Sequence, residues 1–96
     1  MKIINLLNGQ TFRTSNDEAG EFIERIAAGD GVTLSDYNDL EGEVKEIVDR
    51  FIAWNNVYAD NDYETLCLKD GVYNEYKGSG YQMSFDEFVE EFYTEL

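Results

Sequence analysis

The sequence predicts an α+β fold, with one acidic domain over residues 1–96. Its antiparallel sheet, in the element order ββααβββα, is covered by three helices on one side. Three observations lead to this prediction. Apolar residues recur at helical spacing in three segments, and each segment follows a residue that can cap a helix. Segments rich in β-branched and aromatic residues flank turn-forming glycines. The chain contains no internal repeat, low-complexity tract or linker, so one small domain accounts for all of it.

The first element is expected to be a β-hairpin over residues 2–14. Asn8-Gly9 is the strongest two-residue signal for a hairpin turn. The residues that favour a strand before this turn are Ile3, Ile4, Leu6 and Leu7. This apolar run is too short for a signal peptide or for a span of a membrane.

A first helix is expected to begin at Ser15, because Ser15 and Glu18 fit a capping box. Gly29 is placed to end this helix in a left-handed conformation. Gly20 would weaken the helix interior, which indicates a close approach to a neighbouring element. The apolar stripe of the helix consists of Ala19, Phe22, Ile23, Ile26 and Ala27.

A second helix is expected from Ser35, its N-cap, to about Trp54, and Asn55-Asn56 ends it. Its apolar side consists of Leu40, Val44, Ile47, Val48, Phe51 and Trp54. Oppositely charged residues four positions apart are expected to pair on the polar faces, each pair worth a few tenths of a kcal/mol. These pairs are Glu41 with Lys45, Glu46 with Arg50 and, on the first helix, Glu21 with Arg25.

Three strands are expected after a polar loop at residues 60–62. Two of them flank Asp70-Gly71, and a short third strand covers Tyr81–Met83 beyond the turn at residues 78–80. A last helix is expected over residues 84–96, with Ser84 and Glu87 as a capping box. Its apolar face consists of Phe85, Phe88, Val89, Phe92, Tyr93 and Leu96. The predicted core of the whole domain contains Phe22, Ile26, Val44, Ile47, Phe51, Phe88 and Phe92.

Charge is the most unusual property of the chain. It has 21 Asp and Glu against seven Lys and Arg, with no His, which gives a formal net charge of -14. Such a charge opposes the compact state, and a small domain needs only about 2–8 charges to stay soluble. A hydrophobic fraction of 43% and an aromatic fraction of 15% exclude the disorder that high charge otherwise predicts. A strongly basic partner would account for the surplus, and proteins that bind nucleic acids are basic because they neutralise phosphates.

The residues present do not favour catalysis. Without His, acid–base chemistry would fall to carboxylates, Tyr or Lys, and no carboxylate pair stands in an apolar context that would tune its pKa. Cys67, in the segment TLCL, is expected to be a buried core thiol. The segment from Asp60 begins like an EF-hand loop but has Thr65 where Gly is required and Gly71 where Glu is required. We therefore expect no enzyme activity, no metal ion and no cofactor.

The last helix is the candidate binding surface, because its acidic face has no Lys or Arg between Ser84 and Leu96. Like charges four residues apart destabilise a helix slightly, and nothing here compensates them. Along the helix the carboxylates would follow one another at roughly 3 Å, close to the ~3.4 Å phosphate spacing of one DNA strand. The alternative is a solvated acidic face that only keeps the protein soluble. The predicted partner-binding residues are Asp86, Glu87, Glu90, Glu91 and Glu95, extended by Asp60, Asp62 and Glu64 of the polar loop.

With the acidic and aromatic segments YADNDYE and SFDEFVEEFYTEL, the chain resembles the small acidic proteins that phages and mobile elements use against bacterial defence. These are the anti-CRISPR and antirestriction proteins that act as nucleic-acid mimics. The resemblance is one of type, namely size, fold class and acidity, and no family motif is matched. It implies occupation of the DNA- or PAM-binding groove of a CRISPR surveillance complex or Cas nuclease, in the cytoplasm of a bacterial host.

The alternative from another class is an immunity protein or antitoxin that neutralises a cognate basic nuclease toxin. Both interpretations predict a basic protein partner, no direct binding of nucleic acid or membrane, and a monomer or weak dimer. A phage or prophage neighbourhood would favour the first, and an adjacent toxin gene the second. A third interpretation, a small acidic enzyme, would require a pocket with carboxylates of perturbed pKa.

Overall fold

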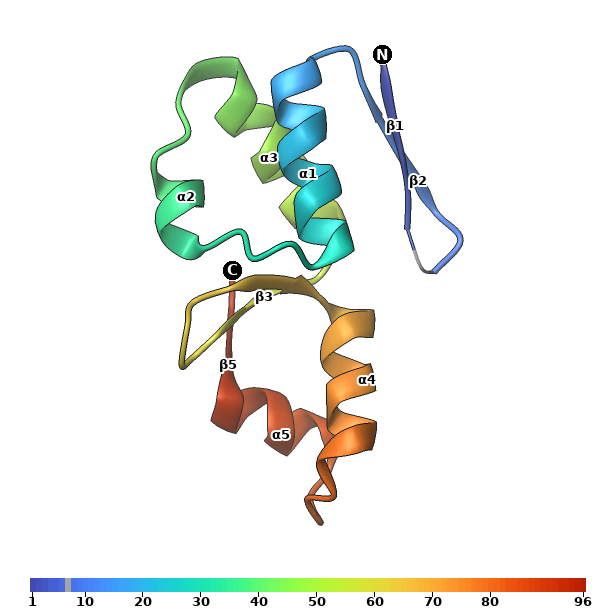
Figure 1. The fold of residues 1–96 in the computed structure, drawn as a ribbon, viewed down its shortest axis with the longest axis vertical. Coiled ribbons are helices and arrows are strands. Elements are labelled where there is room, and N and C mark those ends of the chain that lie inside the picture. The colour runs from blue at the N-terminus through green and yellow to red at the C-terminus, as the bar shows by residue number, and fades with distance from the viewer. Residues whose placement is uncertain (7) are drawn as a thin grey trace.

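The structure is a computed structural model that describes residues 1–6 and 8–96. It confirms the α+β class: over these residues there are five helices and two antiparallel sheets (Figure 1). In chain order the elements are β1 (Lys2–Asn5), β2 (Thr11–Thr14), α1 (Asp17–Ala28), α2 (Leu34–Asn38), α3 (Gly42–Trp54), β3 (Val57–Asp60), β4 (Leu66–Leu68), α4 (Lys69–Ser79), α5 (Phe85–Phe92) and β5 (Tyr93–Glu95). The predicted order ββααβββα is therefore wrong: the second predicted helix is two helices, α2 and α3, and β3 lies where no strand was expected. In the last third of the chain, α4 and β5 replace a predicted strand and the end of the predicted last helix.

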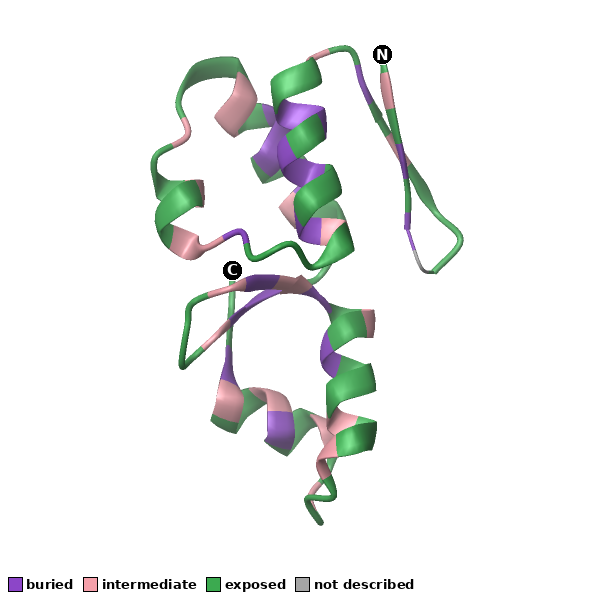
Figure 2. Ribbon diagram, in the orientation of Figure 1, coloured by how far each residue is buried: buried purple, intermediate pink, exposed green. Residues whose placement is uncertain are grey.

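A three-stranded sheet in the order β4-β3-β5 separates two groups of helices (Figure 1). Side chains alternate between the faces of a strand, and β3 is buried on both. Val57 and Ala59 join a core with α1 and α3, whereas Tyr58 packs with residues of α4 and α5. Figure 2 shows this strand as a buried layer between the two groups. The helices therefore cover both faces of the sheet, and the predicted single-sided cover is wrong.

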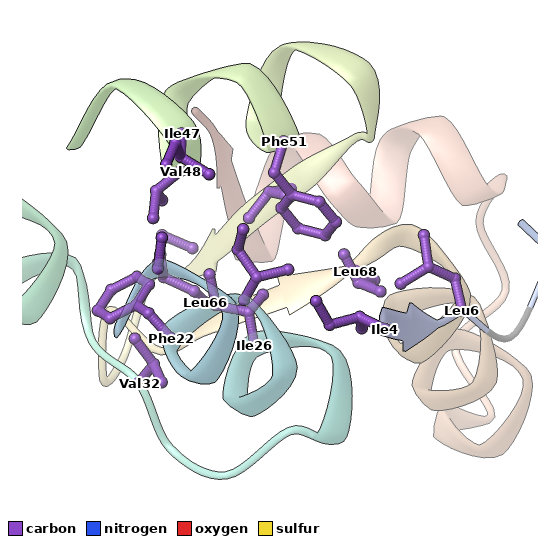
Figure 3. Packing of buried hydrophobic residues seen from close by; sticks show 14 residues of the cluster. Ile4, Leu6, Phe22, Ile26, Val32, Ile47, Val48, Phe51, Leu66 and Leu68 are labelled. Carbon is purple, nitrogen blue, oxygen red and sulfur yellow. The ribbon is translucent and has the colours of Figure 1, made fainter. Parts of the chain in front are cut away.

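The larger core lies between α1, α3, the N-terminal hairpin and the sheet. Side chains from these elements converge in Figure 3, and Phe51, Ile26 and Leu66 are almost completely buried. Of the predicted core residues, five are buried: Phe22, Ile26, Ile47, Phe51 and Phe88. The other two, Val44 and Phe92, are half-buried and pack against the two cores.

The N-terminal hairpin is confirmed. β1 and β2 pair antiparallel from Lys2 opposite Thr14 to Asn5 opposite Thr11. The connection is longer than the two-residue turn expected from Asn8-Gly9, although Gly9 does adopt a positive φ of 87°. Leu7, which the sequence groups with the strand-forming residues, lies outside the described residues.

The helix α1 begins two residues later than the sequence suggests. The side chain of Asn16 caps it by accepting a hydrogen bond from the Ala19 amide at 3.0 Å, so the predicted capping box of Ser15 and Glu18 is wrong. At the other end, Gly29 has the predicted left-handed conformation, with a φ of 72°.

The close approach predicted at Gly20 is confirmed. A Cβ atom built on Gly20 would lie 2.5 Å from the Cβ of Lys2, which belongs to the hairpin. Only glycine lets α1 lie this close to β1, and this contact positions the hairpin against the larger core.

Replacing Gly20 by Ala should therefore lower the free energy of unfolding by about 1–3 kcal/mol, because the new methyl group overpacks the contact with Lys2. Ala is the better helix former by about 1 kcal/mol, so the clash has to exceed this gain. Gly71→Ala in α4 is the matched control: its Cβ meets no atom within 4 Å, and the variant should gain up to about 1 kcal/mol. Urea denaturation of both variants measures the difference, and a stabilised Gly20→Ala protein would contradict the close approach.

The predicted second helix is divided into α2 and α3. Thr33, not Ser35, caps α2, and it forms a reciprocal capping box with Asp36. This hydrogen bonding lowers the pKa of the Asp36 carboxyl group. The chain then breaks before Gly42, which has a φ of 62° that residues other than glycine rarely adopt. The apolar periodicity continues from Leu40 to Val44 across this break, so periodicity alone predicts one long helix.

The residues predicted as two strands around Asp70-Gly71 form instead β4, which ends at Leu68, and the helix α4. Asp70 and Gly71 lie in the first turn of α4. The residues Tyr81–Met83 form a connection and no strand. The aromatic residues of this segment have a high strand propensity, but Val72 and Tyr76, one turn apart on α4, pack against α5. Tertiary packing therefore overrides local propensity here.

The last helix is shorter than predicted. It ends at Phe92, and residues 93–95 form β5, which pairs antiparallel with β3. This pairing places β5 at the edge of the sheet, beside the central strand β3 (Figure 1). Within the described part of the chain, no helix is both long enough and apolar enough to cross a membrane.

Candidate protein-binding surface

Four of the predicted binding residues lie on the solvent side of α5. The Ser84 hydroxyl caps this helix by accepting a hydrogen bond from the Glu87 amide at 3.2 Å. Phe88 is buried against the second core, which orients the helix so that its carboxylates face water. The four exposed acidic residues are Asp86, Glu87, Glu90 and Glu91, as predicted.

Glu95 is not part of this helix, so the predicted row of five carboxylates on one helix is wrong. It lies on β5, opposite Tyr58 of β3, and is exposed. The fold nevertheless brings it close to α5: Glu95, Asp86 and Glu90 line the same groove of about 440 Å³. Lys69 also lines this groove, so one positive charge lies beside these three carboxylates.

The polar loop after β3 is built around Asp60. The Oδ1 atom of Asp60 accepts hydrogen bonds from the amides of Asp62, at 2.7 Å, and Tyr63, at 3.1 Å. Asp62 and Glu64 are exposed. Glu64 has a φ of 56°, an unfavourable value for a residue with a side chain, and the loop holds it there.

Asn61 joins this loop to the end of α5. Its amide nitrogen donates to the Phe92 carbonyl at 3.0 Å, and its side-chain nitrogen donates to the Glu91 carbonyl at 3.1 Å. The Thr94 hydroxyl donates to the Asn61 side-chain oxygen at 2.8 Å. These hydrogen bonds join the acidic loop to the end of the acidic helix, so the two form one connected surface. Asn61 and Thr94 could not be found from the sequence, because they are 33 residues apart and meet only in the fold.

A cleft of about 510 Å³ opens between this loop, α4 and the end of α5. Three carboxylates line it, from Asp60, Asp62 and Glu75. The rest of its wall is largely aromatic, with Tyr81, Phe88, Phe92 and Tyr93. Glu75 was not a predicted site residue, because the sequence places it in a strand and only the helix α4 turns it toward this cleft.

Tyr93 links the cleft to the second core. Its hydroxyl donates to the Oε2 atom of Glu75 at 2.9 Å. Burial, followed by this hydrogen bond, raises the pKa of the Tyr93 hydroxyl. Tyr93 therefore remains a neutral donor at physiological pH and keeps the Glu75 carboxylate in place.

Cys67 packs against the second core but is only half-buried, not buried as predicted. Its thiol donates to the Tyr58 carbonyl at 3.5 Å. Burial raises the pKa of this thiol to about 12, so the sulfur is protonated at neutral pH. On α2, a hydrogen bond to Asp49 raises the pKa of Tyr37 to about 12.

Ion pairs do little to neutralise the acidic surplus. Among the described residues, Lys2 and Glu24 form the one ion pair within 4.0 Å, at 3.4 Å. The predicted pairs along the helices are therefore wrong. Lys45, for example, places its ammonium group 4.0 Å from the centre of the Tyr37 ring. Basic residues are also distributed unevenly along the chain: residues 57–96 contain ten Asp and Glu but two Lys.

Comparison of the chain with protein-family models, with curated proteins and with solved structures found no match. The described residues also contain no group of three acidic or Cys side chains at a spacing that could hold a metal ion. The arrangement defines a class in physical terms: an α+β protein with a connected acidic surface and an acidic, aromatic cleft beside it.

Proposed function

We propose that this protein binds a basic nucleic-acid-binding protein and blocks its DNA or RNA site by acidic mimicry. In the form that we favour, it is an anti-CRISPR protein that acts on a Cas complex or nuclease in the cytoplasm of a bacterial host. The observation that carries the proposal is the connected surface of α5 and the loop at residues 60–64. Six exposed carboxylates lie on it: Asp62, Glu64, Asp86, Glu87, Glu90 and Glu91.

The energetics of the free protein support this proposal. Glu87 and Glu91 repel each other on α5, and so do Asp86 and Glu90. Among the described residues none of these four carboxylates forms an ion pair, although Lys69 lines the groove beside Asp86 and Glu90. The Lys and Arg side chains of a basic groove would attract these carboxylates and offset the repulsion between them. Complementary charge of this kind mainly accelerates association and selects the partner, and salt weakens it.

The experiment is capture on the immobilised protein from a bacterial lysate that contains CRISPR–Cas complexes and other nucleases, followed by competition with labelled DNA. The captured protein should be basic and should bind DNA. Increasing amounts of this protein should displace the DNA, and raising the salt concentration should weaken the complex.

A complex that holds the partner, DNA and this protein at the same time would contradict the proposal. Capture of a nuclease toxin with no role in defence would support the immunity-protein alternative instead. Assays of the purified partner distinguish these outcomes: its own activity and its DNA binding are each measured with and without this protein.

A further inference from the structure

The cleft between the loop at residues 60–64, α4 and the end of α5 combines an aromatic wall with three carboxylates. Its volume of about 510 Å³ falls within the range of about 300–1,000 Å³ that is typical of ligand pockets. Its wall is aromatic, and its rim carries the carboxylates of Asp60, Asp62 and Glu75. An apolar ligand would not need the carboxylates, and a hydrated metal ion would not need the aromatic rings.

The aromatic wall includes an exposed ring held in a fixed position. Tyr81 is 53% exposed, and its ring stacks on Phe92 with 5.2 Å between the centroids and 26° between the planes. Gly80 ends α4 in a left-handed conformation, and the Tyr81 amide donates to the Ser79 hydroxyl at 3.2 Å. The turn therefore orders Tyr81 before any ligand binds, and an ordered exposed aromatic ring is a typical interface anchor.

Two of the carboxylates are also held in place. Asp60 accepts its two backbone hydrogen bonds through Oδ1, and Glu75 accepts the Tyr93 hydrogen bond through Oε2. A carboxylate can accept at both oxygens, so each group keeps an oxygen that can accept from a ligand. Because the protein has already ordered these groups, a ligand that meets them loses little to their immobilisation.

We propose that this cleft binds an arginine side chain of the basic partner. The planar guanidinium group stacks on aromatic rings and donates several hydrogen bonds to carboxylates, which a lysine ammonium group cannot do in the same way. The net charge of -14 attracts a cationic segment to the cleft. This inference rests on the proposed function for the source of the arginine, and it names the residue that the partner inserts beside the α5 surface.

The test uses a probe that needs no partner: N-acetyl-arginine methylamide, titrated into the ¹⁵N-labelled protein and followed by NMR. Saturable shifts are expected at the amides that border the cleft, namely Asp62, Gly78, Ser79 and Tyr81. The neutral citrulline analogue should bind at least about tenfold more weakly, because it has the same shape without the charge. The lysine analogue should also bind more weakly than arginine.

Two variants test the residues. Tyr81→Ala removes the exposed ring, and Glu75→Gln removes one charge while its side-chain oxygen can still accept from Tyr93. Each should weaken arginine binding at least about fivefold. Glu43→Gln on α3 is the matched control, since Glu43 is exposed and outside the cleft, and the same change in charge there should leave the affinity for arginine unchanged. The spectra of the variants report directly whether the fold is intact.

Equal binding of arginine and citrulline, tighter binding of lysine, or shifts spread over α5 instead of the cleft would each overturn the inference. These results are separable from the proposed function. If arginine fails to bind the cleft while charge reversal on α5 still abolishes capture of the partner, the inference is wrong and the proposed function stands. If arginine binds the cleft but the captured partner does not bind nucleic acid, the cleft stands and the proposed function is wrong.

Discussion

Reversal of Glu87, Glu90 and Glu91 to Lys is expected to weaken binding to the captured partner at least about 100-fold. The three residues are exposed on α5, and the reversal replaces three negative charges by three positive ones. Like charges placed against each other in an interface cost several kcal/mol, and each 1.4 kcal/mol is a factor of ten in affinity. Surface plasmon resonance against the purified partner measures the loss, which should lie largely in the association rate at low salt.

The same variant should keep its fold. A lysine in place of Glu90 would lie one turn after Asp86, a favourable pair, and positive charges near the end of a helix interact well with its dipole. A lysine in place of Glu87, near the beginning of α5, costs about 0.3–1 kcal/mol, so the net effect on stability is small. Circular dichroism should therefore match that of the original protein.

The matched control is reversal of Glu41, Glu43 and Glu46, which makes the same change in charge at the beginning of α3. These residues are exposed, and none of them forms an ion pair that the reversal would break, within the part of the chain that is described. This control should lose much less affinity. If instead the α5 variant binds like the original protein, α5 is not the contact surface, and Asp60, Asp62 and Glu64 become the next residues to test.

Phe51→Ala is expected to lower the free energy of unfolding by about 3–5 kcal/mol. Phe51 is completely buried between α1, α3 and the sheet (Figure 3). Its ring meets Phe12 edge-on, with 5.3 Å between the centroids, and lies 6.4 Å from Trp54. Removal of the ring loses its burial and leaves a cavity that this well-packed region cannot close.

Trp54 is the one Trp of the chain and packs close to Phe51, so its fluorescence follows denaturation by urea directly. Ile3→Ala is the control, because Ile3 is 52% exposed and its loss should change the stability by less than about 1 kcal/mol. A loss below about 1 kcal/mol in Phe51→Ala would contradict its position in the core.

The first half of the chain was largely predictable from its sequence, because its signals are local. Asn8-Gly9, Gly29 and the apolar stripe of α1 each act within a few residues of where they stand. The break between α2 and α3 was missed because the apolar period continues across it. The left-handed backbone conformation at Gly42 interrupts the helix, and the spacing of apolar residues carries no signal of this interruption.

The second half was poorly predictable, because non-local contacts decide its structure. The segment of α4 contains Tyr73 and Tyr76, which favour strands, and its helix is stabilised by packing on Phe85 and Phe88 of α5. β5 has three residues, and only its pairing with β3 makes it a strand. A local signal for such a short element does not exist.

The candidate surface was also predictable only in part. The exposure of the carboxylates on α5 followed from helical periodicity and was predicted. The contact of Asn61 with Thr94 and the position of Glu75 beside Tyr93 depend on residues that lie 33 and 18 positions apart. The acidic helix could therefore be predicted from the sequence, whereas the cleft beside it could not.

The strand β3 contributes side chains to both hydrophobic cores. Val57 and Ala59 belong to one core and Tyr58 to the other. Unfolding of either core would therefore expose one face of β3 to solvent. The two halves of the chain are therefore thermodynamically coupled, and the acidic surface depends on packing far from it. Phe51→Ala should lose affinity only as far as it unfolds, whereas reversal of charge on α5 should lose affinity in a fully folded protein.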